Sequence, residues 1–153
     1  KPHGISPNQH FAPVSEECAK LYRDGHFYGC IGLTQAVAEA LVRFLCQRNS
    51  WQPAKQFEEN VKNLRKRIDH PPQLADQLLE IWLHRDDYHH LNPSIEDDRQ
   101  QLQALAKQKA GLLASVEGEV FAFTVNEGKL APRYPKYWDI EGDHATVFLR
   151  LEP

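Results

Sequence analysis

The sequence contains no methionine and only three cysteines among its 153 residues. Cys18, Cys30 and Cys46 are odd in number and show no Cys-x-x-Cys spacing, which disfavours a disulfide framework or a zinc site. We interpret them as reduced residues in the core of a cytoplasmic protein. Because the chain begins at Lys1 and has no methionine, it is compatible with a fragment of a longer protein.

The chain also lacks long hydrophobic runs and a strong charge of either sign. No stretch reaches the length expected of a membrane span, and residues 1–13 lack the basic and apolar regions of a signal peptide. The net charge of -3 and the pI of about 6.2 argue against a protein that coats nucleic acid by bulk attraction. We therefore expect a cytoplasmic protein without a membrane partner, in which any RNA must meet a local basic patch.

What the chain does contain is helical periodicity. Its length and its hydrophobic fraction of 41% suffice for one domain with its own core. We expect a mainly α fold, an antiparallel four- or five-helix bundle over residues 15–116, preceded by an extended arm of residues 1–14. Ser15 is the expected N-cap of the first helix, and Ser94 with Asp97 resembles a capping box for the last. The expected helices span residues 15–23, 26–48, 57–68, 72–91 and 94–116.

Two of these helices carry features with more than one interpretation. Gly29 and Gly32 lower the helix propensity of the long apolar helix, which favours close approach of another helix or a small bend. A phosphate-binding loop is the weaker alternative, because no strand precedes the two glycines. The outer face of the third helix carries Lys62, Arg65, Lys66 and Arg67. This face is either a solvated surface or a patch that contacts RNA phosphates.

The apolar pattern changes after residue 116. Residues 120–125 and 145–151 alternate in polarity, and Asn126-Glu127-Gly128 predicts a turn, so residues 117–153 are expected to form a small antiparallel sheet packed on the bundle within the same domain.

Basic and aromatic side chains interleave in the segment KLAPRYPKYW, residues 129–138, which includes Arg133 and Lys136. Such a segment suits the stacking of unpaired bases and the binding of phosphates. The alternative is an ordered loop whose aromatic rings pack on the bundle.

The richest stretch chemically is WLHRDDYHHLNP, residues 82–93. Leu74, Leu78 and Trp82 recur at the spacing of one helix face, and the next position on that face is Arg85. Arginine is rarely buried without a partner, so Arg85 is expected to face a cleft or a subunit seam. This stretch is therefore the candidate site.

Three kinds of chemistry fit this stretch to different degrees. His84-Arg85-Asp86 spells the HRD of a kinase catalytic loop, but the asparagine required five residues after the aspartate is Leu91 and no glycine-rich loop precedes it. A metal site is the second possibility, because aspartate and histidine are ligands. No other helix offers an inward pair of ligands, so we expect neither a metal nor another cofactor.

The third possibility is metal-free RNA cleavage by Arg85 and His90. An arginine stabilises phosphoryl charge, and a histidine takes the proton from a ribose 2′-hydroxyl. On an ideal helix, side chains five residues apart point about 140° from each other. The helix end must then be distorted, or two copies must meet across a seam. By helix geometry alone His89, four residues after Arg85, is preferred.

The pattern Arg85-Asp86-Asp87-Tyr88-His89-His90, at the end of a helix in a small bundle, resembles the signature of the HEPN superfamily, which is Arg, four to six residues, then His. The long alanine-rich helix upstream, GHFYGCIGLTQAVAEALVRFL, is similar to the helix that HEPN proteins place first in the bundle. The resemblance covers roughly residues 15–116.

The resemblance implies a function. HEPN proteins are commonly homodimers in which Arg and His of both chains form one site, and active members are metal-independent endoribonucleases, many of them toxins or antiviral effectors. Here Arg85 would stabilise the phosphorane, His90 would be the acid or base, and Asp86 would orient the pair, leaving a 2′,3′-cyclic phosphate. Asn92 occupies the position of a tyrosine that antitoxin enzymes modify in some members. The alternatives are a catalytically silent dimerising or nucleotide-binding module, in which Arg85 only closes an ion pair, and a metal-dependent helical enzyme.

Overall fold

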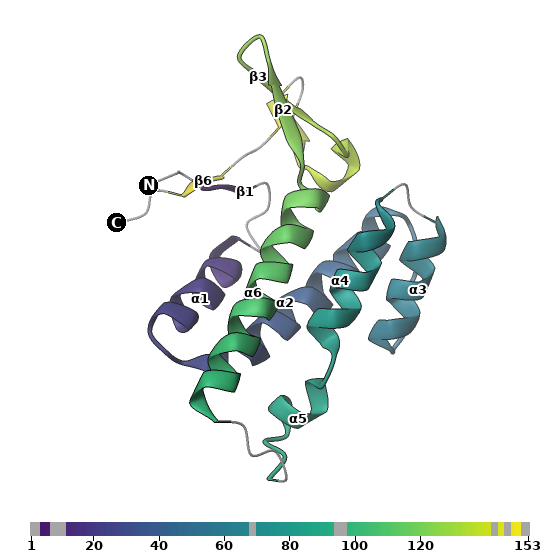
Figure 1. Cartoon of the computed structure of the whole chain (residues 1–153). Helices are drawn as coiled ribbons and strands as arrows, with labels where there is room; N and C mark the ends of the chain where they lie inside the picture. The colour runs from purple at the N-terminus through teal and green to yellow at the C-terminus, as the bar shows by residue number, and fades with distance from the viewer. Residues whose placement is uncertain are drawn as a thin grey trace.

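The computed structural model describes residues 4–6, 12–67, 70–93, 98–141, 144–145 and 148–150. It is mainly helical, a bundle with small β elements, as the sequence predicts (Figure 1). The helices are α1 (Ala12–Arg23), α2 (Phe27–Arg48), α3 (Phe57–Arg67), α4 (Pro72–Trp82), α5 (Arg85–His89) and α6 (Arg99–Val120). Helix α2 is the centre of the bundle and packs against each of the other five.

The first two helices meet at a tight turn. Gly25 adopts a positive φ of 79°, which glycine tolerates and which ends α1 before α2 begins at Phe27. The predicted N-cap at Ser15 is wrong, because α1 begins three residues earlier, at Ala12. The Ser15 hydroxyl instead donates a hydrogen bond to the carboxylate of Glu117 on α6.

The fourth predicted helix is not continuous. Helix α4 ends at Trp82, Leu83 is extended, and His84 adopts a left-handed φ of 61° before the short helix α5 begins at Arg85. Positive φ is unusual for a residue with a side chain, so the break is a defined structural feature. The expectation of one helix over residues 72–91 is therefore wrong. The stretch around Arg85 forms a separate turn of helix at one end of the bundle (Figure 1).

The last helix is displaced toward the C-terminus relative to its prediction. Helix α6 begins at Arg99, and the carboxylate of Asp98 accepts a hydrogen bond of 2.8 Å from the backbone N–H of Gln101, which makes Asp98 the N-cap. The proposed capping box of Ser94 and Asp97 lies outside the described residues. Because α6 continues to Val120, four residues that the sequence analysis gave to the C-terminal segment are helical.

The β structure consists of three two-stranded antiparallel sheets within the described ranges. Strands β2 (Phe123–Asn126) and β3 (Lys129–Pro132) form a hairpin, in which Glu127 and Gly128 both have positive φ, as a two-residue turn of the primed type requires. The expected turn is confirmed, but residues 129–132 are a strand rather than the start of a loop.

The remaining strands differ from the expected pairing. Strand β6 (Phe148–Arg150) pairs with β1 (Gly4–Ser6), which lies inside the predicted extended arm, and not with the segment that follows α6. Strands β4 (Ile140–Glu141) and β5 (His144–Ala145) pair with each other, and a short helical turn at Pro135–Tyr137 precedes them. The alternation of residues 145–151 did not identify these pairings. Strand β1 is distant from β6 in the sequence, and β4 and β5 are only two residues long.

The core lies where the apolar faces of the helices meet. Leu41 and Leu45 of α2, Leu64 of α3, Leu78 of α4 and Val116 of α6 are fully or almost fully buried in one cluster. Burying one such side chain contributes about 1.5–3 kcal/mol. Leu74 and Leu78, which the helical spacing placed on one face, are buried in this cluster, and Trp82 packs against it.

Helix α2 is long and apolar enough, by length and composition only, to cross a membrane. The expectation that no stretch reaches that length is therefore wrong on this criterion. Of its most apolar window, 56% is buried inside the bundle, and packing against several helices accounts for such a composition. Gly32 lies in α2 with no atom within 4 Å of an added Cβ, so the expected close approach of another helix is not found there among the described residues.

The three cysteines are free and buried, as expected for core residues. Burial raises the pKa of each thiol, for Cys18 to about 11. A thiol with a raised pKa is a poor nucleophile at neutral pH, which fits the structural interpretation of these residues.

Candidate functional site

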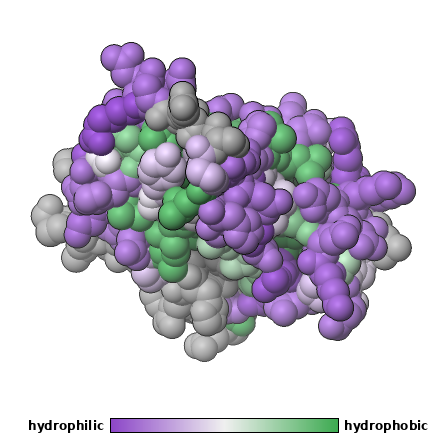
Figure 2. Space-filling model, turned by 90° about the horizontal axis from the view of Figure 1, so that it is seen from below, coloured by the Kyte–Doolittle hydropathy of each residue, from purple (hydrophilic) through white to green (hydrophobic). Residues whose placement is uncertain are grey.

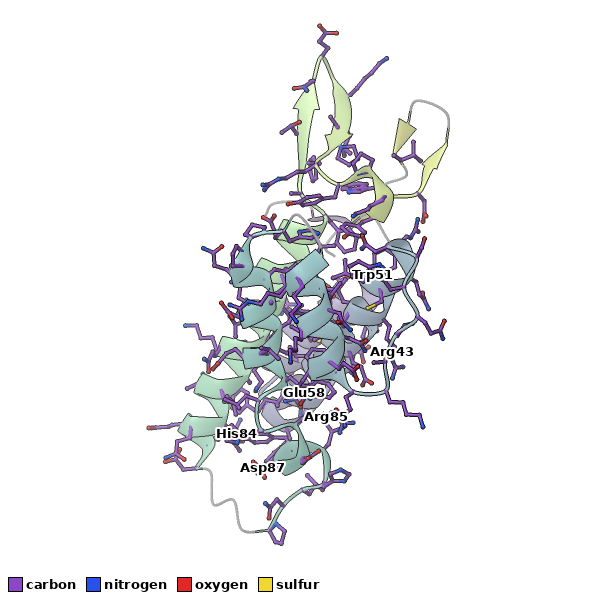
Figure 3. The ribbon with its side chains drawn as sticks, turned by 90° about the vertical axis from the view of Figure 1, so that its right-hand side faces the viewer. Arg43, Trp51, Glu58, His84, Arg85 and Asp87 are labelled. Atoms are coloured by element: carbon purple, nitrogen blue, oxygen red, sulfur yellow. The ribbon has the colours of Figure 1, made fainter. Side chains whose placement is uncertain are left out.

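A groove with a volume of about 700 Å³ runs along the junction of α4 and α5 and the first turn of α3. Trp82 and Phe57 stack in its wall with ring centroids 4.1 Å apart. Glu58 projects from α3 and Arg85 and Asp87 from α5 at the same end of the bundle (Figure 3). The sequence stretch singled out as the candidate site therefore lines a recess in the surface.

Arg85 lies against the wall of this groove. Its guanidinium carbon is 4.8 Å from the centroid of the Trp82 ring, a cation–π contact, and its side chain is 33% exposed. Its Nε is buried and makes no hydrogen bond to any residue that the structure describes. The expectation that Arg85 faces a cleft is confirmed, although Arg85 belongs to α5 and does not continue the apolar face of α4.

One carboxylate oxygen lies near both Arg85 and His90. Asp86 Oδ1 is 3.3 Å from Arg85 Nη1 and 3.9 Å from His90 Nε2. This is possible because α5 ends at His89 and His90 forms its C-cap, so the contact with Asp86 spans one helical turn. The break in the chain direction lies before Arg85, so residues 85–89 are helical and the angular separation of Arg85 and His90 expected of a helix remains.

His89 and His90 differ in what their side chains contact. The His89 side chain is exposed and makes no hydrogen bond or ion pair within the described ranges, whereas His90, although 73% exposed, lies near Asp86. Residues 85–89 are helical, so the geometric preference for His89 stays a prediction. The contact with Asp86 is the feature that distinguishes His90.

The loop after α5 is held by its own polar contacts. Asp87 Oδ2 lies 3.2 Å from His84 Nδ1, and Asp87 Oδ1 accepts a hydrogen bond of 3.1 Å from Asn92 Nδ2. Tyr88 packs toward α2, with its ring 6.1 Å from that of Tyr28. The two polar contacts are local to residues 84–92, and the Tyr88 ring connects α5 to α2.

The charge of the groove is mixed. Carboxylates outnumber cations in its lining, with Glu39, Glu58, Asp86 and Asp87 against Lys55 and Arg85. Glu39 is paired with Arg43, one turn further along α2, at 2.6 Å. A polyanion would therefore reach Arg85 from one side, and would not lie along the whole groove.

The predicted basic face of α3 is exposed next to this site. Lys62, Arg65 and Lys66 follow the groove-lining residues Phe57 and Glu58 by one to two helical turns. Arg65 Nη1 also forms an ion pair of 3.2 Å with Asp76 Oδ1 of α4, both side chains being about half exposed. These cations lie on the same side of the bundle as the groove but do not line it.

Arg133 and Lys136, the other predicted RNA contacts, lie at the opposite end of the bundle from α5, beside the hairpin (Figure 1). Arg133 Nη1 lies 3.3 Å from Glu119 Oε1, and Lys136 Nζ donates a hydrogen bond of 2.6 Å to Asn49 Oδ1. Tyr137 and Trp138 of the same segment are buried. This confirms the alternative in which the segment is ordered and its aromatic rings pack on the bundle. The five predicted RNA contacts do not form one surface with Arg85.

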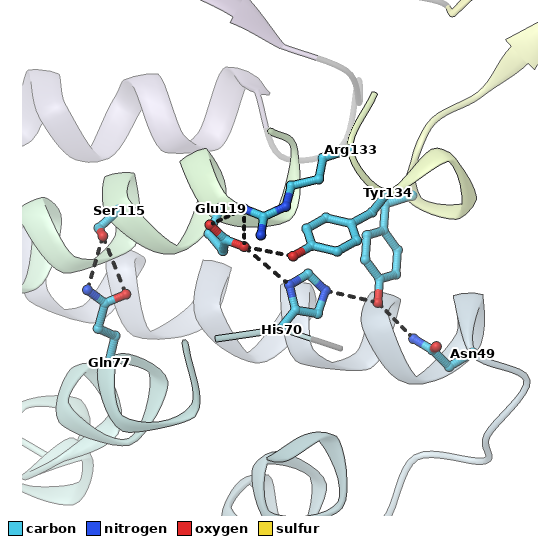
Figure 4. A network of polar contacts seen from close by, with 8 residues as sticks. Asn49, His70, Gln77, Ser115, Glu119, Arg133 and Tyr134 are labelled. Carbon is cyan, nitrogen blue, oxygen red and sulfur yellow. Dashed lines mark hydrogen bonds and ion pairs between the residues drawn. The ribbon is translucent and has the colours of Figure 1, made fainter. Parts of the chain in front are cut away.

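The sequence analysis missed a polar cluster centred on His70 (Figure 4). His70 Nε2 is 3.2 Å from the hydroxyl of Tyr137, and Nδ1 is 3.8 Å from Glu119 Oε1, which also accepts a hydrogen bond of 2.8 Å from Tyr134. The His70 side chain is 3% exposed, and burial lowers its pKa to about 4. A buried, neutral histidine in a network of this kind joins the C-terminal segment to the helices.

The second group that the sequence analysis missed is at the end of α4. Lys109 of α6 is 2% exposed, and its Nζ donates hydrogen bonds to the carbonyl oxygens of Glu80, Ile81 and Leu83 at 3.1, 2.8 and 2.9 Å. Gln35 Nε2 of α2 donates to the Ile81 carbonyl at 3.1 Å. Both residues occupy inward positions of their helices, which is the only signal that the sequence contains for them.

No arrangement typical of a metal site occurs within the parts of the chain that the structure describes. No group of three or more His, Cys, Asp or Glu side chains is close enough to hold an ion. Asp86 and His90 lie one turn apart but lack further ligands from another helix in those ranges.

Comparison with known proteins does not assign the chain to a family. A scan against protein-family models, a search of curated proteins and a search of solved structures each find no match. The function must therefore be inferred from the residues of the groove and their geometry.

Proposed function

We propose that the chain is a metal-independent endoribonuclease of HEPN type, acting through Arg85 and His90. The observation that supports this most is the position of Asp86, whose Oδ1 lies near both Arg85 Nη1 and His90 Nε2. The resemblance implies that the polar residue after the arginine orients the Arg–His pair, and the position of Asp86 near both groups fits that role. The Arg85 side chain is 33% exposed in the groove, so part of it is open to an incoming phosphate oxygen.

The chemistry needs no group beyond these side chains and the RNA. His90 takes the proton of a ribose 2′-hydroxyl, and the 2′-oxygen attacks the adjacent phosphorus. Arg85 neutralises the additional negative charge on the pentacoordinate phosphorane. The bond from phosphorus to the 5′-oxygen then breaks and that oxygen takes up a proton, which leaves a 2′,3′-cyclic phosphate and a 5′-hydroxyl.

A homodimer would complete the site. In one chain a single histidine must serve as both base and acid, whereas two copies of α5 across a seam supply one histidine for each role. Leu83 and Leu91, which flank α5, are exposed apolar residues of the kind that such seams bury. Figure 2 shows this end of the bundle, where hydrophobic residues lie exposed between hydrophilic ones.

The biological role that follows from the proposal is that of a toxin or antiviral effector acting on RNA in the cytoplasm. Such an activity requires restraint, by an antitoxin or by a larger effector chain that contains this domain. In this proposal, the exposed cations Lys62, Arg65 and Lys66 of α3 hold the RNA phosphates that flank the cleaved bond. Arg133 and Lys136 are too far from α5 to take part in the same contact.

The second candidate is a catalytically silent dimerising or nucleotide-binding module of the same shape. The observation that favours it is the same ion pair, because an Arg85 that is neutralised by Asp86 can be purely structural. The excess of carboxylates in the groove also lowers its affinity for a polyanion.

One experiment separates the two candidates. Purified protein is incubated with tRNA and mRNA in excess EDTA, beside the variants Arg85→Ala, His90→Ala and His89→Ala. The nuclease proposal predicts cleavage by the intact protein, a loss of about 10²- to 10⁴-fold in His90→Ala and of about 10²- to 10³-fold in Arg85→Ala. His89→Ala is the matched control and retains activity. Intact RNA in every lane favours the silent module.

The seam is tested by mixing the two inactive variants. If each active centre draws on both chains, then Arg85→Ala and His90→Ala subunits, exchanged into mixed dimers, restore part of the activity that neither variant has alone. A protein that cleaves RNA as a monomer in light-scattering measurements contradicts the shared site.

A further inference from the structure

The end of α4 is closed by a side chain from another helix. The last carbonyl groups of an α-helix have no partner within the helix and are usually satisfied by a following glycine turn. The chain has no glycine here: Leu83 is extended and His84 is left-handed. The carbonyls of Glu80, Ile81 and Leu83 instead accept hydrogen bonds from the buried ammonium group of Lys109.

The match between donor and acceptors is complete. A lysine ammonium carries three N–H donors, and each has one carbonyl partner at a distance of 3.1 Å or less. The charge also lies at the negative end of the α4 dipole, where a cation is stabilised. Gln35 adds a fourth donor from α2, so two helices hold the last turn of α4 and the residue before His84.

We infer that Lys109 and Gln35 are positioning residues that fix the junction of α4 and α5, and thereby set the orientation of Arg85, Asp86 and His90 in the groove. This inference builds on the proposed function, since it assigns the two buried residues a role at that site. Leu83, whose carbonyl Lys109 binds, is two residues before Arg85 in the chain. A shift of the junction is therefore passed directly to the Arg85 side chain and its contact with Trp82.

The protonation state of Lys109 then controls the junction. Burial lowers its pKa to about 8, and the opposing charge is the carboxylate of Glu80 on α4, which raises it. From α2 the group nearest to this junction is the neutral amide of Gln35. A neutral amine has two N–H donors, so loss of the proton leaves one of the three carbonyls without its hydrogen bond. The junction is expected to loosen between pH 7 and pH 9.

Amide hydrogen exchange of residues 83–93 tests the inference directly. Lys109→Met removes the donors at nearly constant side-chain length, and Lys107→Met, an exposed lysine on the same helix, is the matched control. In Lys109→Met these amides should exchange about tenfold faster or more, while the centre of α2 is unchanged. RNA cleavage should fall by about a hundredfold, since a small displacement of a reacting group has effects of that size. Lys107→Met should match the wild type in both measurements.

Two further exchange measurements test the inference if Lys109→Met does not fold. Gln35→Leu should accelerate exchange at the same residues to a smaller extent. In the wild type, exchange there, corrected for the intrinsic pH dependence, should rise from pH 7 to pH 9. If Lys109→Met folds and its exchange at these residues is unchanged, the inference is overturned. If Lys109→Met does not fold, the inference is overturned when neither Gln35→Leu nor the rise in pH changes the exchange. If exchange is faster in Lys109→Met but the wild-type protein cleaves no RNA, the positioning role is supported and the nuclease proposal is refuted.

Discussion

Replacing His70 by phenylalanine should remove a specific part of the acid sensitivity of this fold. In the folded chain burial lowers the His70 pKa to about 4 from its ordinary value of 6.5. Between these values the unfolded chain binds a proton that the folded chain does not, so the free energy of unfolding falls as the pH falls. The loss amounts to about 2 kcal/mol by pH 5 and about 3 kcal/mol by pH 4.

The geometry explains why this proton is excluded. Tyr137 accepts a hydrogen bond of 3.0 Å from Asn49, so its own hydroxyl is free to donate to His70 Nε2. The proton of the neutral ring then lies on Nδ1, which faces Glu119 Oε1 at 3.8 Å. A second proton, on Nε2, would require the Tyr137 hydroxyl to turn and give up its hydrogen bond to the ring.

Urea unfolding of wild type, His70→Phe and His26→Gln at pH 7, 5 and 4 measures the effect. The phenylalanine keeps the ring contacts with Tyr134 and Tyr137 but cannot titrate. Its stability should therefore fall less than that of the wild type on acidification, by the amounts given above. His26 is exposed, so its replacement should leave the full pH dependence. Equal pH dependence in the wild type and His70→Phe would refute the buried, neutral histidine.

Other substitutions test the bundle itself. Leu78→Ala should lower the free energy of unfolding by about 2–5 kcal/mol in urea titrations, because the side chain is fully buried, whereas Val125→Ala on the exposed hairpin should change it by about 0.5 kcal/mol or less. Asp98→Ala should remove about 1 kcal/mol through loss of the α6 N-cap, seen as a lower thermal midpoint; an unchanged midpoint would contradict the capping bond. The three cysteines should react with a thiol reagent at pH 8 only after unfolding in urea, and fast labelling of the folded chain would contradict their burial.

The sequence predicted those features that depend on local pattern. Helices α2 and α3 follow from the spacing of their apolar residues, and Glu127-Gly128 from the turn of a hairpin. The placement of Arg85 in a cleft also followed, because an arginine interrupts an apolar stripe. These inferences need only a few neighbouring residues.

The features that failed depend on distant parts of the chain. Nothing in Trp82-Leu83-His84-Arg85 marks a helix end, since there is neither glycine nor proline; the carbonyls there are satisfied by Lys109, 26 residues beyond Leu83. The contact of His70 with Glu119 likewise joins α6 to the loop before α4. Strand β1 pairs with β6 across nearly the whole chain. Such pairings are set by tertiary packing, which local propensity does not encode.

The break at the end of α4 places the candidate site on a short helix of its own. Arg85, Asp86 and His89 belong to α5, and His90 is its C-cap. Within α5 the spacing of Arg85 and His90 is still that of a helix, so the break does not change the angle between them. The position of Asp86 near both groups is the feature that favours this pair.

The central proposal is that Arg85 and His90 cleave RNA without a metal. The most direct measurement is the chemistry of the fragment ends formed from a defined RNA in excess EDTA, with the matching RNA that carries a 2′-deoxyribose at the cleaved position as the control. The proposal predicts 2′,3′-cyclic phosphate ends from the RNA, no cleavage at the deoxy position, and none by Arg85→Ala or His90→Ala. Cleavage that persists at the deoxy position or in both variants, or that disappears with EDTA, would contradict it.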